Sequence, residues 1–334
     1  MKKLSHENFI KARDYVFTHS DDINRAWFRY NFEDAGTAAF MNVLAQYQYE
    51  NGGFGGLVYE YEYNDPTLFD TSTAFFRYLF YLKEKPAADH PVVQRMMQYL
   101  LERYRPEVGG WGDLYEPGVN DGVHVPWCGY TGDENTPIPD EDERIKTYSP
   151  NRHSVLAAFV ALYSELVPEA LYRDIIKYPI EKILRYYDKA SPLCGQSGKS
   201  EWHENDIAVP YNMKGYNQFV ACLSDEKLAD RLKSILLQNP TACMNLDQNK
   251  WPYDFEDAAC EIVSAPGSFL YPAVINEVNF SLDFLVKRMN DEGRWQLKWR
   301  LGDGAAFDRL QEKYDAHLTM LYLAILHRFG RIEL

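Results

Sequence analysis

Two kinds of hydrophobic segment alternate along this chain. In the first kind, apolar residues line one face of an expected helix, as they do within residues 35–48. In the second kind, apolar residues fill almost every position, as in residues 74–82, 155–163 and 318–326. A helix that is apolar on every face must be buried, whereas a one-sided helix covers the outside of a core. The alternation therefore predicts helical hairpins packed as an inner and an outer layer.

The order of these segments favours one closed domain. One-sided helices are expected at residues 6–18, 35–48, 90–105, 169–187, 226–238 and 274–289. An aromatic, acidic loop around Trp27 and Tyr30 is expected between the first two. The first and last helices both carry apolar residues of the inward type, whereas an open solenoid needs polar end caps. The sequence thus predicts a single all-α domain over residues 1–334, arranged as a closed (α/α)5-6 toroid.

A glycine turn recurs where the one-sided helices end. Its most complete copy is residues 48–56 (QYENGGFGG), and weaker copies occupy residues 105–112 and 290–295. Looser versions surround Trp202 and Trp251. The spacing is about 50 residues once a loop insertion at about 113–148 is set aside, which is typical of a repeated helical hairpin.

This turn resembles the QW repeat of the terpenoid cyclase and protein prenyltransferase superfamily. Gln48, Gly52 and Phe54 match the pattern Q-x-x-x-G-x-[FW]. The resemblance implies a toroid that binds an apolar or isoprenoid ligand in a central, aromatic-lined funnel, with acid-initiated or zinc-dependent chemistry. The acidic D-x-D-D of the cyclases is absent, and the corresponding segment, residues 68–74, retains only Asp70.

Zinc is the one cofactor that the resemblance suggests. Prenyltransferase β-subunits bind zinc through D-x-C at one inner helix and a histidine on the next. Here Asp257 and Cys260 stand three residues apart, and His317 follows on the last expected inner helix. A thiolate, a carboxylate and an imidazole can hold zinc with an open fourth position. The alternative is a buried cysteine beside a helix-capping aspartate, with no metal.

Carboxylates recur at the expected starts of inner helices, which would place them at one mouth of a toroid. The members of this set are Asp70, Asp206, Glu256, Asp257 and Asp315. Paired carboxylates can serve as acid and base in a carbohydrate-active enzyme. The same residues also suit plain helix capping in a toroid that binds a ligand or protein without catalysis. Within an enzyme, the catalytic candidates are Asp70, Asp257 and His317.

Aromatic residues make up 15% of the chain, more than an ordinary core requires. Trp127 and Tyr130 lie in the insertion and either cover a ligand or simply pack within a loop. His203 stands near acidic residues that would orient it as a base, and the alternative is an ordinary histidine in a surface loop. Cys128 is a further nucleophile candidate if a histidine lies beside it. The full set of expected binders for an apolar or sugar ligand is Trp111, Trp127, Tyr130, His153, Trp202, His203, Trp251 and Trp295.

Charge and cysteine content narrow the partners. A net charge of −14 repels phosphate backbones and anionic lipid, so no nucleic-acid partner is expected. The apolar runs are well short of the ~20 residues of a membrane helix, and the N-terminal residues do not resemble a signal peptide. Five cysteines without a C-x-x-C pair fit reduced thiols. A cytoplasmic location is therefore predicted.

Overall fold

The computed structural model describes residues 1–107, 109–112, 114–129, 150–191, 210–241, 244–251, 258–297 and 299–334. Regular structure in these ranges is helical, and extended residues form only isolated bridges. The prediction of an all-α fold is thus confirmed. The α-helices are α1 (His6–His19), α2 (Asp22–Phe32), α3 (Gly36–Leu44), α4 (Leu68–Thr73), α5 (Pro91–Arg103), α7 (Pro150–Leu162), α8 (Glu169–Tyr187), α9 (Pro210–Cys222), α10 (Glu226–Leu236), α11 (Ala259–Ile262), α12 (Ile275–Arg288) and α13 (Ala305–Arg328).

The segment around Trp27 is a helix, so the expectation of a loop there was wrong. The Asp21 side chain caps α2 by accepting the backbone N–H of Asn24. The apolar face of α2 is buried and consists of Ile23, Ala26, Trp27 and Tyr30. These positions follow the i, i+3, i+4, i+7 spacing of a one-sided helix.

The apolar run 74–82 differs from the expected α-helix. Helix α4 begins earlier, at Leu68, and its N-cap is Thr67 rather than Asp70 or Thr71. It continues as a π-helical turn (Ala74–Tyr78) and then a 3₁₀ turn (Leu79–Tyr81). The other two all-apolar runs lie within α7 and α13 and are mostly buried, as predicted.

The first glycine turn connects α3 to α5 through side-chain and backbone contacts. The amide nitrogen of Gln48 donates to the carbonyl oxygens of Gly52 and Val92, each at 3.0 Å. Its amide oxygen accepts the Arg95 guanidinium at 2.8 and 3.0 Å. Gly52 has a φ of 91°, and a Cβ there would overlap the Arg95 carbonyl oxygen. The backbone N–H of the buried Phe54 donates to the Thr71 hydroxyl on α4, so the turn contacts α4 as well as α5.

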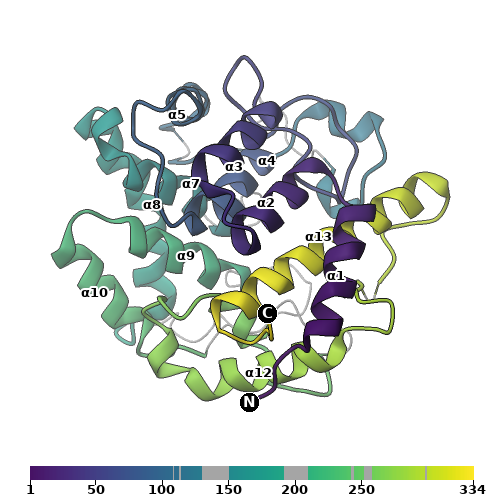
Figure 1. The fold of residues 1–334 in the computed structure, drawn as a ribbon. Coiled ribbons are helices and arrows are strands. Elements are labelled where there is room, and N and C mark those ends of the chain that lie inside the picture. Colours follow the sequence, from purple (N-terminus) through teal and green to yellow (C-terminus); the bar gives the residue numbers. More distant parts are fainter. Residues whose placement is uncertain are drawn as a thin grey trace.

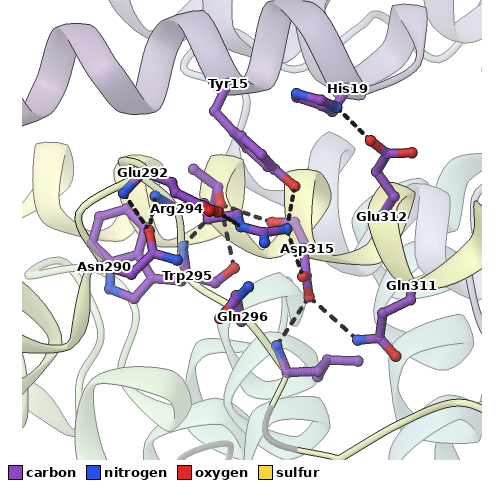
Figure 2. Close-up of polar contacts among 12 residues, drawn as sticks. Tyr15, His19, Asn290, Glu292, Arg294, Trp295, Gln296, Gln311, Glu312 and Asp315 are labelled. Carbon is purple, nitrogen blue, oxygen red and sulfur yellow. Dashed lines mark hydrogen bonds and ion pairs between the residues drawn. The ribbon is translucent and has the colours of Figure 1, made fainter. Parts of the chain in front are cut away.

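The turn at residues 290–295 also approaches a helix closely, in this case α1. Gly293 has a φ of 83°, and a Cβ there would overlap the Lys11 side chain and lie 2.7 Å from the Lys11 carbonyl carbon. Figure 2 shows Arg294 between α1 and α13, donating to the Tyr15 hydroxyl at 2.8 Å and paired with Asp315 at 3.3 Å. The glycine of the last turn thus packs against α1, and the glycine of the first turn packs against α5.

The two ends of the chain also pair with each other (Figure 1). Leu4 and Ile332 form a parallel bridge, in which the Leu4 N–H donates to the Arg331 carbonyl oxygen at 2.8 Å. The buried Arg331 side chain pairs with Asp283 on α12 at 2.7 Å. Helices α1 and α13 lie in contact between these ends.

Gly293→Ala is expected to lower the free energy of unfolding by about 2 kcal/mol or more, because the change adds steric overlap with α1 to the strain of a positive φ. Gly304 has a φ of 105° but open space around it, so Gly304→Ala reports the strain alone. Gly267→Ala, at open space without a positive φ, is the neutral control. Urea unfolding measures all three. An equal loss in Gly293→Ala and Gly304→Ala would contradict close docking on α1.

Candidate functional site

Three charged side chains from different elements form what we call the charged centre: Glu60, Arg77 and Arg152. Glu60 lies in the connection that follows the first turn, Arg77 in the π-helical turn, and Arg152 in the first turn of α7. All three remain partly exposed. Desolvation acts to lower the pKa of Arg77, but Glu60 and nearby tyrosines outweigh it and the pKa is raised. Arg77 donates to the Leu57 carbonyl oxygen in the segment that carries Glu60, and the Arg152 guanidinium lies 5.2 Å from the ring of Phe76, the residue next to Arg77.

The Arg152 guanidinium lies over two aromatic rings. Its guanidinium carbon lies 4.1 Å from the centroid of Phe69 and 5.2 Å from that of Phe76. One terminal nitrogen donates to the hydroxyls of Ser72 at 3.4 Å and Thr73 at 3.2 Å. Burial, followed by repulsion from Arg77, lowers the pKa of Arg152 to about 10, so the group is still charged at neutral pH.

The first part of the insertion predicted at 113–148 packs against the segment that carries Glu60. The Val125 N–H donates to the Glu60 carbonyl oxygen at 2.9 Å, and residues 61 and 124 form an antiparallel bridge. In the same region the Cys128 sulfur accepts the Tyr115 hydroxyl at 3.4 Å. Burial, followed by the charge of Glu60, raises the pKa of Cys128 to about 12. The thiol is protonated at neutral pH, which disfavours Cys128 as a nucleophile.

His317 is a buried, neutral imidazole whose tautomer can be assigned. The Asn24 amide nitrogen donates to Asp21 at 2.8 Å and to the Tyr59 hydroxyl at 2.7 Å, which fixes the orientation of that amide. Its oxygen therefore faces His317 Nδ1, at 2.9 Å, so Nδ1 carries the hydrogen. Nε2 then presents a lone pair, and it has no partner within the part of the chain that the structure describes. Burial, followed by the charge of Arg77, lowers the pKa of His317 well below its ordinary value.

Asp70 is fully buried, and both of its oxygens are occupied by its own chain. One accepts the Leu57 N–H at 2.7 Å, and the other accepts the hydroxyls of Tyr61 and, at 2.8 Å, Thr67. Burial raises the pKa of Asp70 to about 6 despite these hydrogen bonds. The carboxylate thus holds the connection after the first turn onto α4.

Asp315 has the same role after the last turn. It accepts the Leu297 N–H at 3.0 Å and pairs with Arg294, as Figure 2 shows. The two described members of the expected acidic set therefore bind the backbone that follows a turn aromatic. The other members, Asp206, Glu256 and Asp257, lie outside the described residues.

The described tryptophans among the expected ligand binders lie in the core. Each indole N–H donates to a backbone carbonyl oxygen, and the pairs are Trp111 with Leu100, Trp251 with Asn245, and Trp295 with Leu285. His153 is also buried and packs edge-on against Trp111. These four side chains pack behind the turns. Tyr130, Trp202 and His203, and the side chain of Trp127, lie outside the described residues.

The proposed zinc ligands are described only in part. Cys260 is buried on α11, where burial raises the pKa of its thiol, and its backbone N–H donates to Ser281 at 2.9 Å. Across the residues that the structure describes, no three His, Cys, Asp or Glu side chains come together as a metal site. Asp257 falls outside that part of the chain, so the zinc site stays a prediction.

The charged centre was not found from the sequence. Its one local signal is Arg77, a charged residue within the otherwise apolar run 74–82. A charge that must be buried with such a run is costly unless it has a specific role. Arg152 and Glu60 lie in ordinary polar contexts, so only the tertiary structure brings them to Arg77.

No protein-family model matches the chain, and no curated protein does so either. Among the described residues, no helix has both the length and the apolar content needed to cross a bilayer.

The loss of unfolding free energy caused by Asp70→Asn is expected to become smaller as the pH rises from 4 to 7. The folded pKa of about 6 exceeds the ordinary value, so folded protein binds the extra proton in this window and wild type loses stability as that proton dissociates. The difference in unfolding free energy should shift by about 2 kcal/mol toward the variant. Urea unfolding across this range measures it. A difference that does not change with pH would contradict the raised pKa.

Proposed function

We propose that the chain is a closed (α/α) toroid of the kind found in the terpenoid cyclase and protein prenyltransferase superfamily. The helices alternate as outer members α1, α3, α5, α8, α10 and α12 and inner members α2, α4, α7, α9, α11 and α13. Contacts between α4 and α7, α7 and α9, α9 and α11, and α13 and α2 follow this inner order. Docking of the last turn on α1 supports closure.

The function that the geometry supports best is binding of a small molecule at the charged centre, with His317 as a general base. The observation that carries this proposal is the unpartnered Nε2 of His317, on a side chain that is 3% exposed. A buried acceptor without a hydrogen bond costs about 1–3 kcal/mol. Such a group calls for an explanation, and a proton-accepting role supplies one. The Asn24 hydrogen bond holds the imidazole in the tautomer that accepts a proton at Nε2.

The character of the charged centre favours a polar ligand. An isoprenoid chain needs a continuous apolar lining, whereas Glu60, Arg77 and Arg152 alternate here with partly exposed rings such as Phe76 and Tyr115. Rings beside charged groups suit sugars, whose faces are apolar and whose edges form hydrogen bonds. We therefore place a carbohydrate-type substrate ahead of an isoprenoid. The chemistry would use His317 rather than paired carboxylates, because Asp70 and Asp315 are engaged by backbone.

The cysteines support a reducing compartment. Cys128, Cys222 and Cys260, the three within the described residues, are all free thiols. Cytosolic proteins usually keep their thiols reduced. We propose the cytoplasm as the location on this ground.

His317→Gln is expected to lower turnover by about 100-fold or more while leaving the dissociation constant of the substrate within a few-fold, since general-base catalysis supplies a factor of this size. The measurement is an unbiased screen of glycans and glycosides by mass spectrometry, followed by kinetics on whatever is converted. His19→Gln, at a partly exposed histidine paired with Glu312, is the matched control. Unchanged turnover in His317→Gln would exclude the base. Binding without turnover in wild type would favour a non-catalytic toroid.

The tautomer of His317 can be tested without a substrate. In ¹⁵N-labelled protein, the ring should remain neutral with its hydrogen on Nδ1 from pH 8 down to pH 5.5, because burial and Arg77 hold its pKa well below 6.5. Two-dimensional NMR of the ring nitrogens reports both properties. A hydrogen on Nε2, or protonation near the ordinary pKa, would contradict the assignment.

A further inference from the structure

We infer that Arg77 and Arg152 form an oxyanion-binding pair, which takes a carboxylate or phosphate group carried by the ligand. The inference rests on the proposed function only in placing that ligand at the charged centre. It adds the chemical class of the ligand: an acidic or phosphorylated molecule rather than a neutral one.

Most hydrogen-bond donors of the pair have no acceptor among the described residues. A guanidinium has five N–H donors. Arg77 donates to the Leu57 carbonyl oxygen at 3.3 Å, and Arg152 uses one terminal nitrogen, toward Ser72 and Thr73. Neither arginine makes an ion pair with a carboxylate in the described part of the chain. Both side chains are partly exposed, so these free donors can reach an acceptor that a ligand brings.

Glu60 does not neutralise the pair. One of its oxygens accepts the Tyr59 N–H at 3.0 Å, and its single negative charge faces two guanidinium groups. His317 adds no charge, and Asp70, although ionised at neutral pH, accepts hydrogen bonds at both oxygens from groups other than the two arginines. The centre therefore keeps a positive excess in a chain whose net charge is −14. A bound anion would offset both the desolvation of the two arginines and their mutual repulsion.

The pair is also held in place before a ligand arrives. The Arg152 guanidinium lies over the Phe69 ring and donates to two hydroxyls on α4, and its position at the start of α7 adds the positive end of a helix dipole. Arg77 lies in a π-helical turn, a feature that occurs often at functional sites. Planar, pre-oriented guanidinium groups bind carboxylate and phosphate through two parallel hydrogen bonds.

A second observation connects this pair to the proposed chemistry. Arg77 bonds the Leu57 carbonyl oxygen two residues before Tyr59, whose ring lies 5.0 Å from that of His317, and His317 Nε2 is unpartnered within the described residues. An oxyanion held by Arg77 would therefore lie beside the proposed base. The two features define one site with an anchor for the acidic group and an acceptor for a proton.

The test titrates folded wild-type protein with glucuronate, inorganic phosphate and glucose at constant ionic strength, by calorimetry. At least one of the two anions is expected to bind, and at least tenfold more tightly than glucose. Binding of glucuronate alone assigns a carboxylate ligand, and binding of phosphate assigns a phosphorylated one. Arg77→Gln and Arg152→Gln should each weaken that binding at least tenfold. Arg173→Gln, which removes the same charge from an exposed ion pair with Glu169, should leave it unchanged.

Arg152→Lys is a second variant that guards against a folding defect, because it keeps the charge and loses only the planar fork. It should also weaken anion binding, with an unchanged circular dichroism spectrum. Equal affinity for glucose and the anions, no binding of either anion, or full anion affinity in both Gln variants would each overturn the pair. The comparison of His317→Gln turnover decides the proposed function separately, so the two can fail independently.

Discussion

The close approach of a glycine turn to the next outer helix is the constraint on which the rest of the structure depends. At Gly52 and Gly293 the backbone takes a positive φ and leaves no space for a side chain against Arg95 and Lys11. The aromatic residue that follows each turn is buried, and its N–H donates to a threonine hydroxyl on the adjoining inner helix. A carboxylate on that helix, Asp70 or Asp315, then binds the backbone two or three residues further on. Asp70, near the start of α4, and Asp315, which lies in the middle of α13 rather than at the expected helix start, therefore help to attach each turn to the following helix.

The proposed site depends on the same contacts. Asp70 fixes the connection at Leu57 by accepting its backbone N–H, and Arg77 donates to the carbonyl oxygen of the same residue. His317 owes its tautomer to Asn24, which lies 293 positions away in the sequence. These two residues meet because α13 packs against α2, at the place where the first and last hairpins are neighbours. The proposed closure of the chain and the proposed site thus both depend on the packing of α13 against α2.

The helices and the turns could be predicted from the sequence because their causes are local. One-sided and all-round apolar patterns follow from burial, and a turn that needs a positive φ needs glycine. Helix α2 is an exception to this rule. Ile23, Ala26, Trp27 and Tyr30 have helical spacing, but the polar residues among them are typical of a loop. The charged centre could not be predicted, since no sequence pattern relates Arg77 to Arg152. For the buried tryptophans, the sequence predicts a role that the structure does not show. Trp111 and Trp295 are expected to bind a ligand, yet each indole N–H donates to a backbone carbonyl oxygen in the core.

Native-state hydrogen exchange of the α1 amides tests most directly whether the chain closes through α1. If α1 is the outer helix on which the last turn docks, its amides should exchange only with the global unfolding that also exposes α13, at the same free energy and with the same denaturant dependence. Exchange of α1 through a smaller opening, while α13 stays protected, would contradict the account. The N-terminal helix would then be peripheral, and the last turn would not close the chain through it.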